Sequence, residues 1–511
     1  MEHLPKHPNK QKNKNTPNLQ PNPPPNINHQ LTTDVPPCSG LGFSTCCRLV
    51  DEFLFSRPQT QKLHLIATTR DASKSHSTLS RLRTHLSATL RSANSRTAGI
   101  SVLLEPRIQL SSEQLDLCDL VSVKRLGTRL VQRGQRIDVL VLNAGIGGWK
   151  GLDWGRAVWS IVTDWVTATT YPTYKLGWTG RTAPKQIVGR HGQGRKTVKG
   201  SKNDEHEDED ALEPRLGETF TANVFGHYLL AHWLVPVMRG SRDQSPGRVI
   251  WVSSLEAYAH CLDLDDLQGL ATDASYESSK RLTDLLVLTS ELPSTKPYVS
   301  GYLTADAQTG HVGSKEAEAE AKANVKAEAG QERDDDDDDT LPPKLFLAHP
   351  GICGTSIANL NPLLNLCMLF AFHISRLLGS PWHTISPYLG ACSMVWLSLC
   401  PLTDLEIFED SKRHKKAKWG SSADVFGRER VMLTEVGGWG WSGRVGEAND
   451  GKMKVAGGSW RGLERVTEES REGFEGLGRR AWAEMEGLRK EWEVRLADVG
   501  ADEEGGEQEA L

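Results

Sequence analysis

Residues 137–145 have the sequence IDVLVLNAG, a continuous apolar run that ends in Asn, Ala and Gly. Two later runs have the same character: RVIWVSS at 248–254 and KLFLAH at 344–349. Helical patterns at 218–238 and 276–291 fall between these strands. Continuous apolar strands that alternate with helices indicate a parallel sheet covered on both faces. The expected fold class is therefore α/β, a doubly wound parallel sheet with its ligands at the carboxyl ends of the strands.

The N-terminal part of the chain contains one further strand of the sheet, but no recognisable first strand. LHLIATT at 63–69 is a buried strand, and SGLG at 39–42 begins an amphipathic helix. Residues 1–38 are rich in Pro and Asn and contain few large apolar side chains, so they are predicted to form a disordered N-terminal extension. No strand is recognisable before the helix. The first strand of the sheet is accordingly expected to be missing or degraded.

The overall composition excludes several classes of protein. The formal net charge of −5 over 511 residues gives no case for a nucleic-acid partner. The nine cysteines form no CxxC pair, a spacing that suits neither a zinc site nor a disulfide framework, and no metal site is expected. The segment from Met1 to Asn28 is too polar to be the core of a secretory signal. These features indicate a reduced, cytosol-facing protein.

The expected main domain covers residues 39–435, with several segments of unusual composition. The polar stretch 178–210 is predicted to be a solvated insertion, and the acidic stretch 301–343 a disordered one. The stretch 359–402 contains the most apolar sequence and is predicted to be a substrate lid or a membrane-associating segment. Residues 436–511 are expected to form a charged C-terminal tail that is partly helical.

A Tyr-x-x-x-Lys pair carries the expected chemistry. The i, i+4 spacing places the phenol of Tyr276 and the ammonium of Lys280 on one face of a helix. A nearby cation favours the phenolate, so the pKa of Tyr276 is predicted to be lowered. The tyrosine could then act as a general acid toward a carbonyl oxygen while hydride arrives at carbon. A Tyr-x-x-x-Lys match by itself is more often part of an ordinary surface helix.

Other motifs strengthen this interpretation because they occur in a fixed order along the chain. They are Asn143-Ala144-Gly145 after one strand, Asn223 in the next helix, Ser253 and Ser254 after the following strand, and Pro350-Gly351 after the last. A serine hydroxyl at the end of a strand can hydrogen-bond the same substrate oxygen as the tyrosine. Each motif alone is explained by structure, but all of them together in this order are rarely accidental.

These motifs resemble those of the short-chain dehydrogenase/reductases, and more closely those of the fungal 3-keto-steroid reductases of sterol C-4 demethylation. The resemblance covers residues 39–300 and 341–440. It is carried by SGLGFS (39–44), CCRL (46–49), NAGIGGW (143–149), ANVFGHY (222–228), YESSKR (276–281), HPGIC (349–353), TS (355–356) and KWG (418–420). It implies a Rossmann-type fold and an NADP-dependent oxidoreductase that reduces a 3-keto sterol to the 3β-hydroxy sterol in ergosterol biosynthesis.

The resemblance also implies a role for each matching residue. Tyr276 would be the proton donor, Lys280 would hold the nicotinamide ribose, and Asn223 would support a proton relay. The catalytic serine falls on Ser253 or Ser254, and the choice between them stays open. The implied cofactor-binding residues are Gly40, Gly42, Arg70, Asp116, Asn143, Ala144, Gly145, Tyr276, Lys280, Ile352, Thr355 and Ser356.

The second strand indicates which cofactor is used. Arg70 ends that strand, at the position where an acidic residue would bind the ribose hydroxyl of NAD. A cation there accommodates the 2′-phosphate of NADP instead. NADPH is therefore the expected cofactor.

The chain departs from this family at the Gly-rich turn. Only Gly40 and Gly42 remain of the turn, and VPPC at 35–38 stands where the rest should be. The two prolines remove backbone N–H donors that the pyrophosphate needs. Either the N-terminus shown is not the translated one, or the protein has lost dinucleotide binding. We favour the first explanation because the downstream motifs are intact.

The resemblance further implies a cellular location and partners. It favours the endoplasmic reticulum membrane or a lipid droplet, on the cytosolic face, with peripheral membrane association. A sterol would be the substrate, and the other C-4 demethylation enzymes would be partners. Two alternative functions stay open: a reductase of another bulky lipophilic ketone, and a catalytically dead short-chain dehydrogenase/reductase paralogue that acts as a scaffold.

Overall fold

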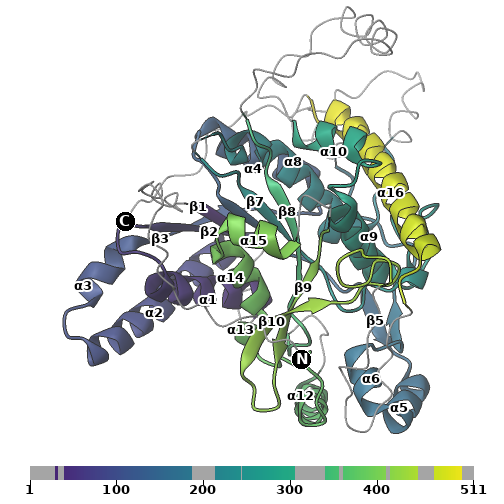
Figure 1. The fold of residues 1–511 in the computed structure, drawn as a ribbon, viewed down its shortest axis with the longest axis horizontal. Coiled ribbons are helices and arrows are strands. Elements are labelled where there is room, and N and C mark those ends of the chain that lie inside the picture. The colour runs from purple at the N-terminus through teal and green to yellow at the C-terminus, as the bar shows by residue number, and fades with distance from the viewer. Residues whose placement is uncertain are drawn as a thin grey trace, which may run out of the picture.

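The described part of the chain is built on a central eight-stranded sheet (Figure 1). The structure is a computed structural model, and it describes residues 29–32, 40–186, 213–242, 244–304, 340–355, 361–409, 415–446 and 465–497. The strand order is β10-β9-β8-β7-β4-β1-β2-β3. The strands are β1 (His29–Thr32), β2 (Leu63–Thr69), β3 (Ile108–Gln114), β4 (Val139–Leu142), β7 (Arg248–Val252), β8 (Lys344–His349), β9 (Lys418–Ala423) and β10 (Glu429–Thr434).

This topology confirms the predicted doubly wound α/β fold. Neighbouring strands are parallel from β3 to β9, and β10 is antiparallel to β9. The order runs from β1 toward β3 on one side and from β4 toward β9 on the other, so the chain changes direction between β1 and β4. Ligands of such sheets bind beside this switch point, at the carboxyl ends of the strands.

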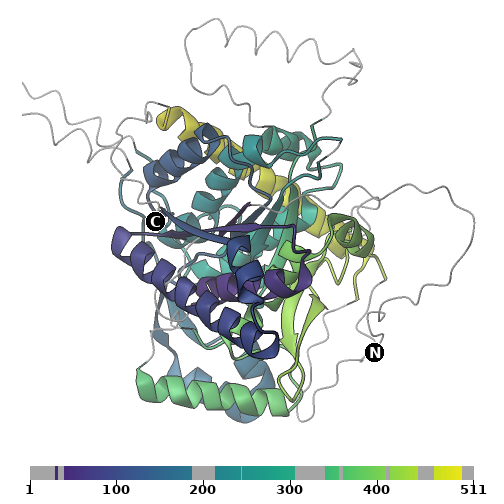
Figure 2. The same cartoon turned by 90° about the vertical axis from the view of Figure 1, so that its left-hand side faces the viewer.

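Helices cover both faces of the sheet (Figures 1 and 2). Alternate side chains of one strand enter the two cores, with Leu140 and Leu142 on one side and Val139 and Val141 on the other, which explains the continuous apolar runs. One layer contains α4 (Leu120–Gln132), α8 (Gly226–Met238), α9 (Ser275–Thr289), α10 (Lys296–Leu303) and α16 (Glu468–Arg495). The other contains α1 (Leu41–Ser56), α2 (Ala72–Arg96), α3 (Ser101–Leu104), α13 (Pro387–Gly390), α14 (Cys392–Leu399) and α15 (Leu402–Glu409).

The first strand is short but present, so the prediction of no strand before the first helix is wrong. Strand β1 pairs with β2 and with β4, and its Leu31 lies beside Ile66 on one side and Leu140 on the other. Four residues suffice because the flanking strands both offer backbone groups that need hydrogen-bond partners. The predicted disordered extension is therefore wrong for residues 29–32, and the rest of it lies outside the described residues.

A small antiparallel sheet, which was not predicted from the sequence, stands apart from the main one. It pairs β5 (Trp149–Leu152) with β6 (Lys175–Gly177). Helices α5 (Trp154–Thr163) and α6 (Trp165–Thr170) connect the two strands. We call residues 149–177 the small lobe; it lies below the main sheet in Figure 1.

The apolar stretch predicted at 359–402 divides into two parts. Helix α12 (Pro362–Leu377) lies on the surface and contacts α6 of the small lobe, whereas α14 is a buried core helix. Among the described residues no single helix is long and apolar enough to cross a membrane. Helices Pro387–Leu399 and Leu402–Glu409 pass that test only as a pair bent by 107°.

The C-terminal segment 436–511 is more than a charged tail. Its helix α16 packs along α9 and buries Phe474, Trp482 and Trp492 in the same core as α8 (Figure 1). Most of the predicted insertions at 178–210 and 301–343 lies outside the described residues, although Gly301–Leu303 ends helix α10.

Candidate active site

Helix α9 carries Tyr276 and Lys280 at the carboxyl edge of the sheet. The Nζ atom of Lys280 lies 5.7 Å from the centre of the Tyr276 ring. The same atom donates a hydrogen bond of 2.8 Å to the carbonyl oxygen of Val252, the last residue of β7. The i, i+4 spacing in the sequence therefore places the phenol and the ammonium together beside the end of a central strand.

The two serines that follow β7 have different partners. The Ser254 side chain hydrogen-bonds the phenol of Tyr276, and its Oγ atom accepts the N–H of Glu256 at 3.1 Å. The Oγ atom of Ser253 is turned toward helix α9 and donates to Oδ1 of Asp284 at 2.5 Å. The geometry therefore favours Ser254 over Ser253 as the serine that acts with the tyrosine.

Asn223 lies in a π-helical turn, Thr221–Phe225, which precedes α8. Its Oδ1 atom accepts the N–H of Ile146 at 2.8 Å, and its Nδ2 atom donates to the carbonyl of Ile146 and to Oγ of Ser279. A Cβ atom on Gly145 would lie 2.8 Å from Oδ1 of Asn223, so a larger residue there would displace the Asn223 side chain. Single π turns occur often at functional sites, because the extra residue redirects a side chain.

Burial determines the pKa values of the central pair. Burial raises the pKa of Tyr276 far above its usual range, the Glu256 carboxylate raises it further, and the Ser254 hydrogen bond lowers it. The prediction of a lowered tyrosine pKa is therefore wrong, because desolvation of the phenolate outweighs the attraction of the cation. Burial also lowers the pKa of Lys280 to about 8, although Asp284 opposes the change. At neutral pH the phenol is protonated and the lysine is mostly charged.

A second charged group, which no sequence pattern reveals, borders Tyr276. The Nζ atom of Lys175, from β6, bonds both carboxylate oxygens of Glu256, at 2.7 and 2.5 Å. It also lies 3.8 Å from the centre of the Trp149 ring, whose edge meets the Tyr276 ring with centroids 4.9 Å apart. The small lobe thus forms one wall of the site. No spacing signal joins residues that lie this far apart in the chain.

The carboxylate of Glu277 lies in the same region. Burial first, and then the charge of Glu256, raise the pKa of Glu277 to about 7. A backbone N–H and then the ammonium of Lys175 act in the opposite direction. This site therefore contains a carboxyl group that titrates near neutral pH.

The segment after β8 forms the other wall. Gly351 has a φ of +70°, and a Cβ there would lie 2.5 Å from the carbonyl oxygen of Trp382, so the turn requires glycine. Ile352 donates its N–H to Trp382 at 2.7 Å. Thr355 follows in the described chain, whereas the predicted cofactor residue Ser356 lies outside the described residues.

The residues expected to hold the adenine half of a cofactor follow strands at the same edge. Arg70 is exposed and directly follows β2, and Asn143 and Ala144 follow β4. Asp116 follows β3, and its Oδ1 atom accepts the N–H of Cys118 at 2.9 Å. The charges of Arg70 and Asp116 both act on the Cys118 thiol, so both lie near it.

Gly40 and Gly42 lie at the N-terminus of α1, which Gly40 caps. The backbone N–H groups at the start of a helix of this length suit a phosphate. The segment that joins β1 to this helix, residues 33–39, lies outside the described residues, so its two prolines are not placed.

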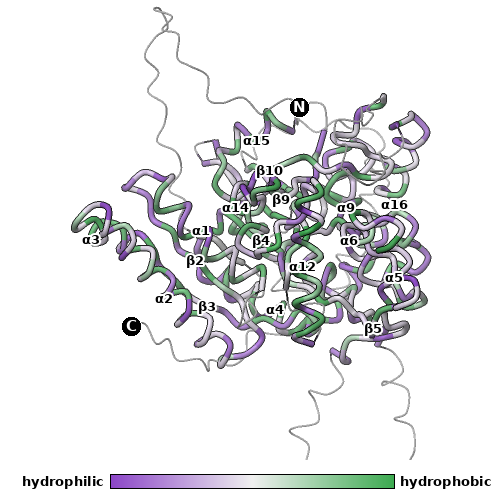
Figure 3. The backbone as a smooth tube through the Cα atoms, turned by 90° about the horizontal axis from the view of Figure 1, so that it is seen from below, coloured by the Kyte–Doolittle hydropathy of each residue, from purple (hydrophilic) through white to green (hydrophobic). Residues whose placement is uncertain are grey.

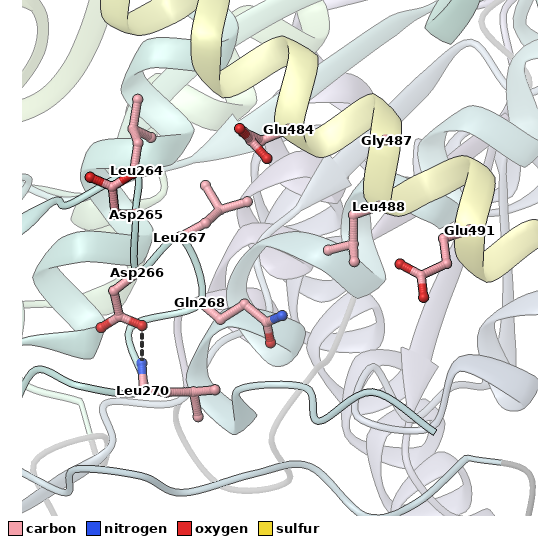
Figure 4. Close-up of a pocket in the computed structure, with 10 residues that line it drawn as sticks. All are labelled: Leu264, Asp265, Asp266, Leu267, Gln268, Leu270, Glu484, Gly487, Leu488 and Glu491. Atoms are coloured by element: carbon pink, nitrogen blue, oxygen red, sulfur yellow. Dashed lines mark hydrogen bonds between the residues drawn. The ribbon is translucent and has the colours of Figure 1, made fainter. Parts of the chain in front are cut away.

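A separate pocket of about 470 Å³ lies between the loop before Tyr276 and helix α16 (Figure 4). Its lining includes Asp265, Asp266, Glu484 and Glu491, and none of the predicted site residues. Four carboxylates disfavour an anionic dinucleotide. This pocket is therefore not the cofactor site.

A doubly wound sheet with this tyrosine, lysine, serine and asparagine at its switch-point edge defines a short-chain dehydrogenase/reductase. No protein-family model matches the chain. A 3-keto-steroid reductase of Aspergillus fumigatus is 42% identical over 91% of this chain and 94% of its own length, and one of Gibberella zeae is 36% identical over 89% and 92%. The chain therefore belongs to the 3-keto-steroid reductase family.

Two more distant comparisons do not carry the assignment. A 3-keto-steroid reductase of Schizosaccharomyces pombe is 28% identical over 78% of this chain and 88% of its own length. A solved structure of 7α-hydroxysteroid dehydrogenase with NADH and 7-oxo glycochenodeoxycholic acid covers 73% of this chain and 88% of that chain. Its TM-score is 0.34 and its identity 11%, so the family assignment rests on the sequence relatives.

Proposed function

We propose that this protein is an NADPH-dependent 3-keto-steroid reductase, which converts a 3-keto sterol to the 3β-hydroxy sterol in ergosterol biosynthesis. The observation that carries the proposal is the position of Lys280, whose Nζ atom lies 5.7 Å from the centre of the Tyr276 ring and bonds the carbonyl of Val252, two residues before Ser254. The names of the relatives at 42% and 36% identity support the choice of substrate.

The residues divide the chemistry among them. When bound, NADPH supplies a hydride to the carbonyl carbon. Tyr276 gives its phenolic proton to the carbonyl oxygen, and Ser254 hydrogen-bonds the same oxygen and polarises the carbonyl. The C=O π bond is replaced by one C–H and one O–H bond. A tyrosine with a raised pKa suits this step, because it is protonated at neutral pH.

Lys280 and Asn223 support the proton donor. The ammonium of Lys280 stabilises the phenolate that remains after proton transfer. Asn223 fixes the backbone at Ile146 through both of its side-chain polar atoms, and it contacts Ser279 in the turn between Tyr276 and Lys280. We assign these two residues to the relay that returns a proton to Tyr276.

Arg70 supports the choice of NADPH over NADH. Its side chain is exposed and directly follows β2, so its guanidinium is available to an incoming phosphate. A guanidinium binds phosphate oxygens with two parallel hydrogen bonds. Gly40, Gly42 and Gly145 fit the same cofactor, because they leave backbone N–H groups and space beside Asn223.

We also propose that the protein binds the cytosolic surface of the endoplasmic reticulum membrane or of a lipid droplet. The exposed side of α12 carries Leu363, Leu366, Phe370 and Leu377, which are 64–70% exposed. Their spacing of three, four and seven residues forms an apolar stripe along one side of the helix.

Helix α5 of the small lobe adds a second stripe. Trp154, Val158, Trp159 and Val162 are 56–77% exposed, and Arg156 is exposed beside them. Seen from below, α12, α6 and α5 lie next to one another (Figure 3). We call these two stripes together the apolar face. Helix α5 belongs to the small lobe that borders Tyr276, and an apolar face close to the site would suit a substrate dissolved in lipid.

The experiment that tests the catalytic assignment replaces Tyr276 with Phe. We expect turnover of a 3-keto sterol to fall by about 10²–10⁴-fold, the range that a general acid contributes. The dissociation constant for NADPH, measured by fluorescence titration, should stay the same because only a hydroxyl is lost. Tyr258→Phe is the matched control: this nearby tyrosine bonds the carbonyl of Pro172, and its variant should keep full turnover.

Two outcomes would contradict the proposal. Full turnover by the Tyr276→Phe variant would exclude the tyrosine as proton donor. A wild-type protein that binds NADPH but forms no 3β-hydroxy sterol from a 3-keto sterol would exclude the substrate.

A further inference from the structure

A buried ion pair lies directly behind the catalytic groups. The Nζ atom of Lys418, the first residue of β9, is 2.6 Å from Oδ2 of Asp284. The two side chains are 3% and 1% exposed. Asp284 is one turn beyond Lys280 on α9, so Tyr276, Lys280 and Asp284 follow one another along the same side of the helix.

The pair holds the end of β7 at two adjacent residues. Lys418 donates a second hydrogen bond, of 2.7 Å, to the carbonyl oxygen of Ser254. The other carboxylate oxygen of Asp284 accepts the hydroxyl of Ser253 at 2.5 Å. Ser253 also reaches the carbonyl of Lys280, at 3.4 Å. Strand β7, strand β9 and helix α9 are thus joined at the point where Ser254 turns toward the tyrosine.

We propose that Lys418 and Asp284 are positioning residues, which hold Ser254 in place relative to Tyr276 and Lys280. The inference rests on the catalytic roles proposed above and assigns no contact with substrate to either residue. A shift of about 1 Å in a catalytic group can cost on the order of 100-fold in rate. Two charge-assisted hydrogen bonds and the hydroxyl of Ser253 oppose such a shift here.

Stability alone does not account for this pair. A buried ion pair contributes little more than a well-packed apolar pair of the same size, because both charges must leave water. The chain contains a comparison two residues before this strand: Lys416 pairs with Glu409 at 3.0 Å, with side chains 3% and 2% exposed, and also with the partly exposed Glu291 at 3.0 Å. That pair reaches the carbonyl of Leu345 and the indole of Trp419 instead of the catalytic residues.

The same pair also affects Lys280 electrostatically. Asp284 raises the pKa of Lys280 and Lys418 lowers it, with burial as the largest influence. The other charged or titratable groups around these residues are Tyr276 and Arg281 on α9, His227 on α8 and His349 on β8. Neither histidine adds charge, because burial and the neighbouring lysine lower the pKa of each.

Double substitutions test positioning without leaving a buried charge unpaired. We expect Lys418→Met with Asp284→Leu to bind NADPH as the wild type does and to lose about 10- to 100-fold in kcat. The matched control, Lys416→Met with Glu409→Leu, removes an equally buried pair and should retain kcat. A kcat within twofold of the wild type in the Lys418/Asp284 variant would overturn the proposal, as would an equal loss in the control.

Single substitutions provide a readout that a purely structural role would not change. Asp284→Asn should move the basic limb of the pH–kcat profile to lower pH, because Lys280 loses a neighbouring carboxylate. Lys418→Gln should move it to higher pH, because Lys280 loses a neighbouring cation. Lys418→Arg keeps the charge and should restore activity relative to Lys418→Gln. Shifts of both profiles in the same direction, or none, would overturn the proposal.

The Tyr276→Phe variant separates this inference from the function on which it rests. If that variant is inactive while the Lys418/Asp284 double variant is fully active, only the positioning role fails. If the Tyr276→Phe variant is itself fully active, the catalytic assignment fails, and the positioning role fails with it.

Discussion

The charges around Tyr276 come from three different parts of the chain. Lys280 is on its own helix, Glu256 follows β7, and Lys175 arrives from the small lobe. Glu256 raises the tyrosine pKa, and Lys175 bonds both oxygens of that carboxylate and so reduces its effect. The acidity of the Tyr276 phenol is therefore a balance between groups that only the folded chain brings together.

The pKa of Lys280 predicts how turnover depends on pH. Burial lowers this pKa to about 8, so the ammonium is present below pH 8 and is lost as the pH rises through that value. The neutral amine stabilises a phenolate less well. We expect kcat for ketone reduction to be steady near neutral pH and to fall above about pH 8. A profile of kcat at saturating NADPH measures this, and a flat profile up to pH 10 would contradict it.

Arg70 predicts the preference between cofactors. Arg70→Glu should raise the KM for NADPH by about 10- to 100-fold, because the 2′-phosphate loses one or two hydrogen bonds to a charged partner. The KM for NADH should stay the same or fall, because NADH carries no 2′-phosphate. Arg83→Glu is the control, because Arg83 is an exposed arginine within α2. It should change neither the KM for NADPH nor the KM for NADH. Equal effects of Arg70→Glu on both cofactors would exclude a role in phosphate recognition.

At the scale of elements, a glycine allows α9 and α16 to pack closely against each other. A Cβ atom on Gly478 would lie 2.4 Å from Cγ2 and 2.8 Å from Cβ of Thr289, a buried residue of α9. The indole N–H of Trp482 bonds the carbonyl of Leu286 on the same helix. Helix α9 is thus held from its outer side by a helix that is distant in sequence.

Alanine substitutions at two glycines of α16 should change the free energy of unfolding in opposite directions. Gly478→Ala should lower the free energy of unfolding by about 1–3 kcal/mol, because the added methyl meets Thr289. Gly476→Ala should raise it by about 0.5–1 kcal/mol, since no atom lies within 4 Å of the new Cβ and alanine favours a helix. Urea unfolding of both variants measures the difference. A stabilising Gly478→Ala would show that the two helices can separate at little cost.

The sequence predicts most of the sheet and the central pair of the site, but not the parts that depend on distant contacts. Continuous apolar runs identify β2, β4, β7 and β8, whereas HQLT in β1 has no such pattern and is a strand because two neighbours pair with it. The i, i+4 spacing gives Tyr276 and Lys280. Lys175 cannot be found this way, because it joins the site through a small sheet that has no strong strand pattern. The choice of Ser254 likewise depends on where Asp284 holds Ser253.

At the scale of the whole molecule, the small lobe links the apolar face to the residues around Tyr276. The small lobe supplies α5 to the face and Lys175 and Trp149 to the site. The segment after Gly351 supplies another wall of the site and then leads to α12. An anchored face would therefore place both walls of the site next to lipid.

Charged substitutions on the apolar face should weaken membrane binding. We expect Trp159→Glu with Val162→Glu on α5, and Leu366→Glu with Phe370→Glu on α12, each to reduce binding to phosphatidylcholine vesicles at least tenfold. Burying one such side chain is worth about 1.5–3 kcal/mol. Vesicle sedimentation measures this, with Val494→Glu on α16 as the control, because Val494 is 79% exposed outside the face. Unchanged sedimentation of both double variants would exclude the face as the anchor.

Helix α16 also bears on how the protein is made. It is the last helix of the described chain, and it brings Glu486 and Arg489 to Tyr228 and His232 on α8. Synthesis proceeds from the N-terminus, so the ribosome releases the catalytic helix well before the helix that covers it. The newborn enzyme therefore exposes apolar surface on α8 and α9 until its C-terminal segment has emerged. A chain ended early by a nonsense codon would retain every catalytic residue and still display that surface to chaperones and proteases.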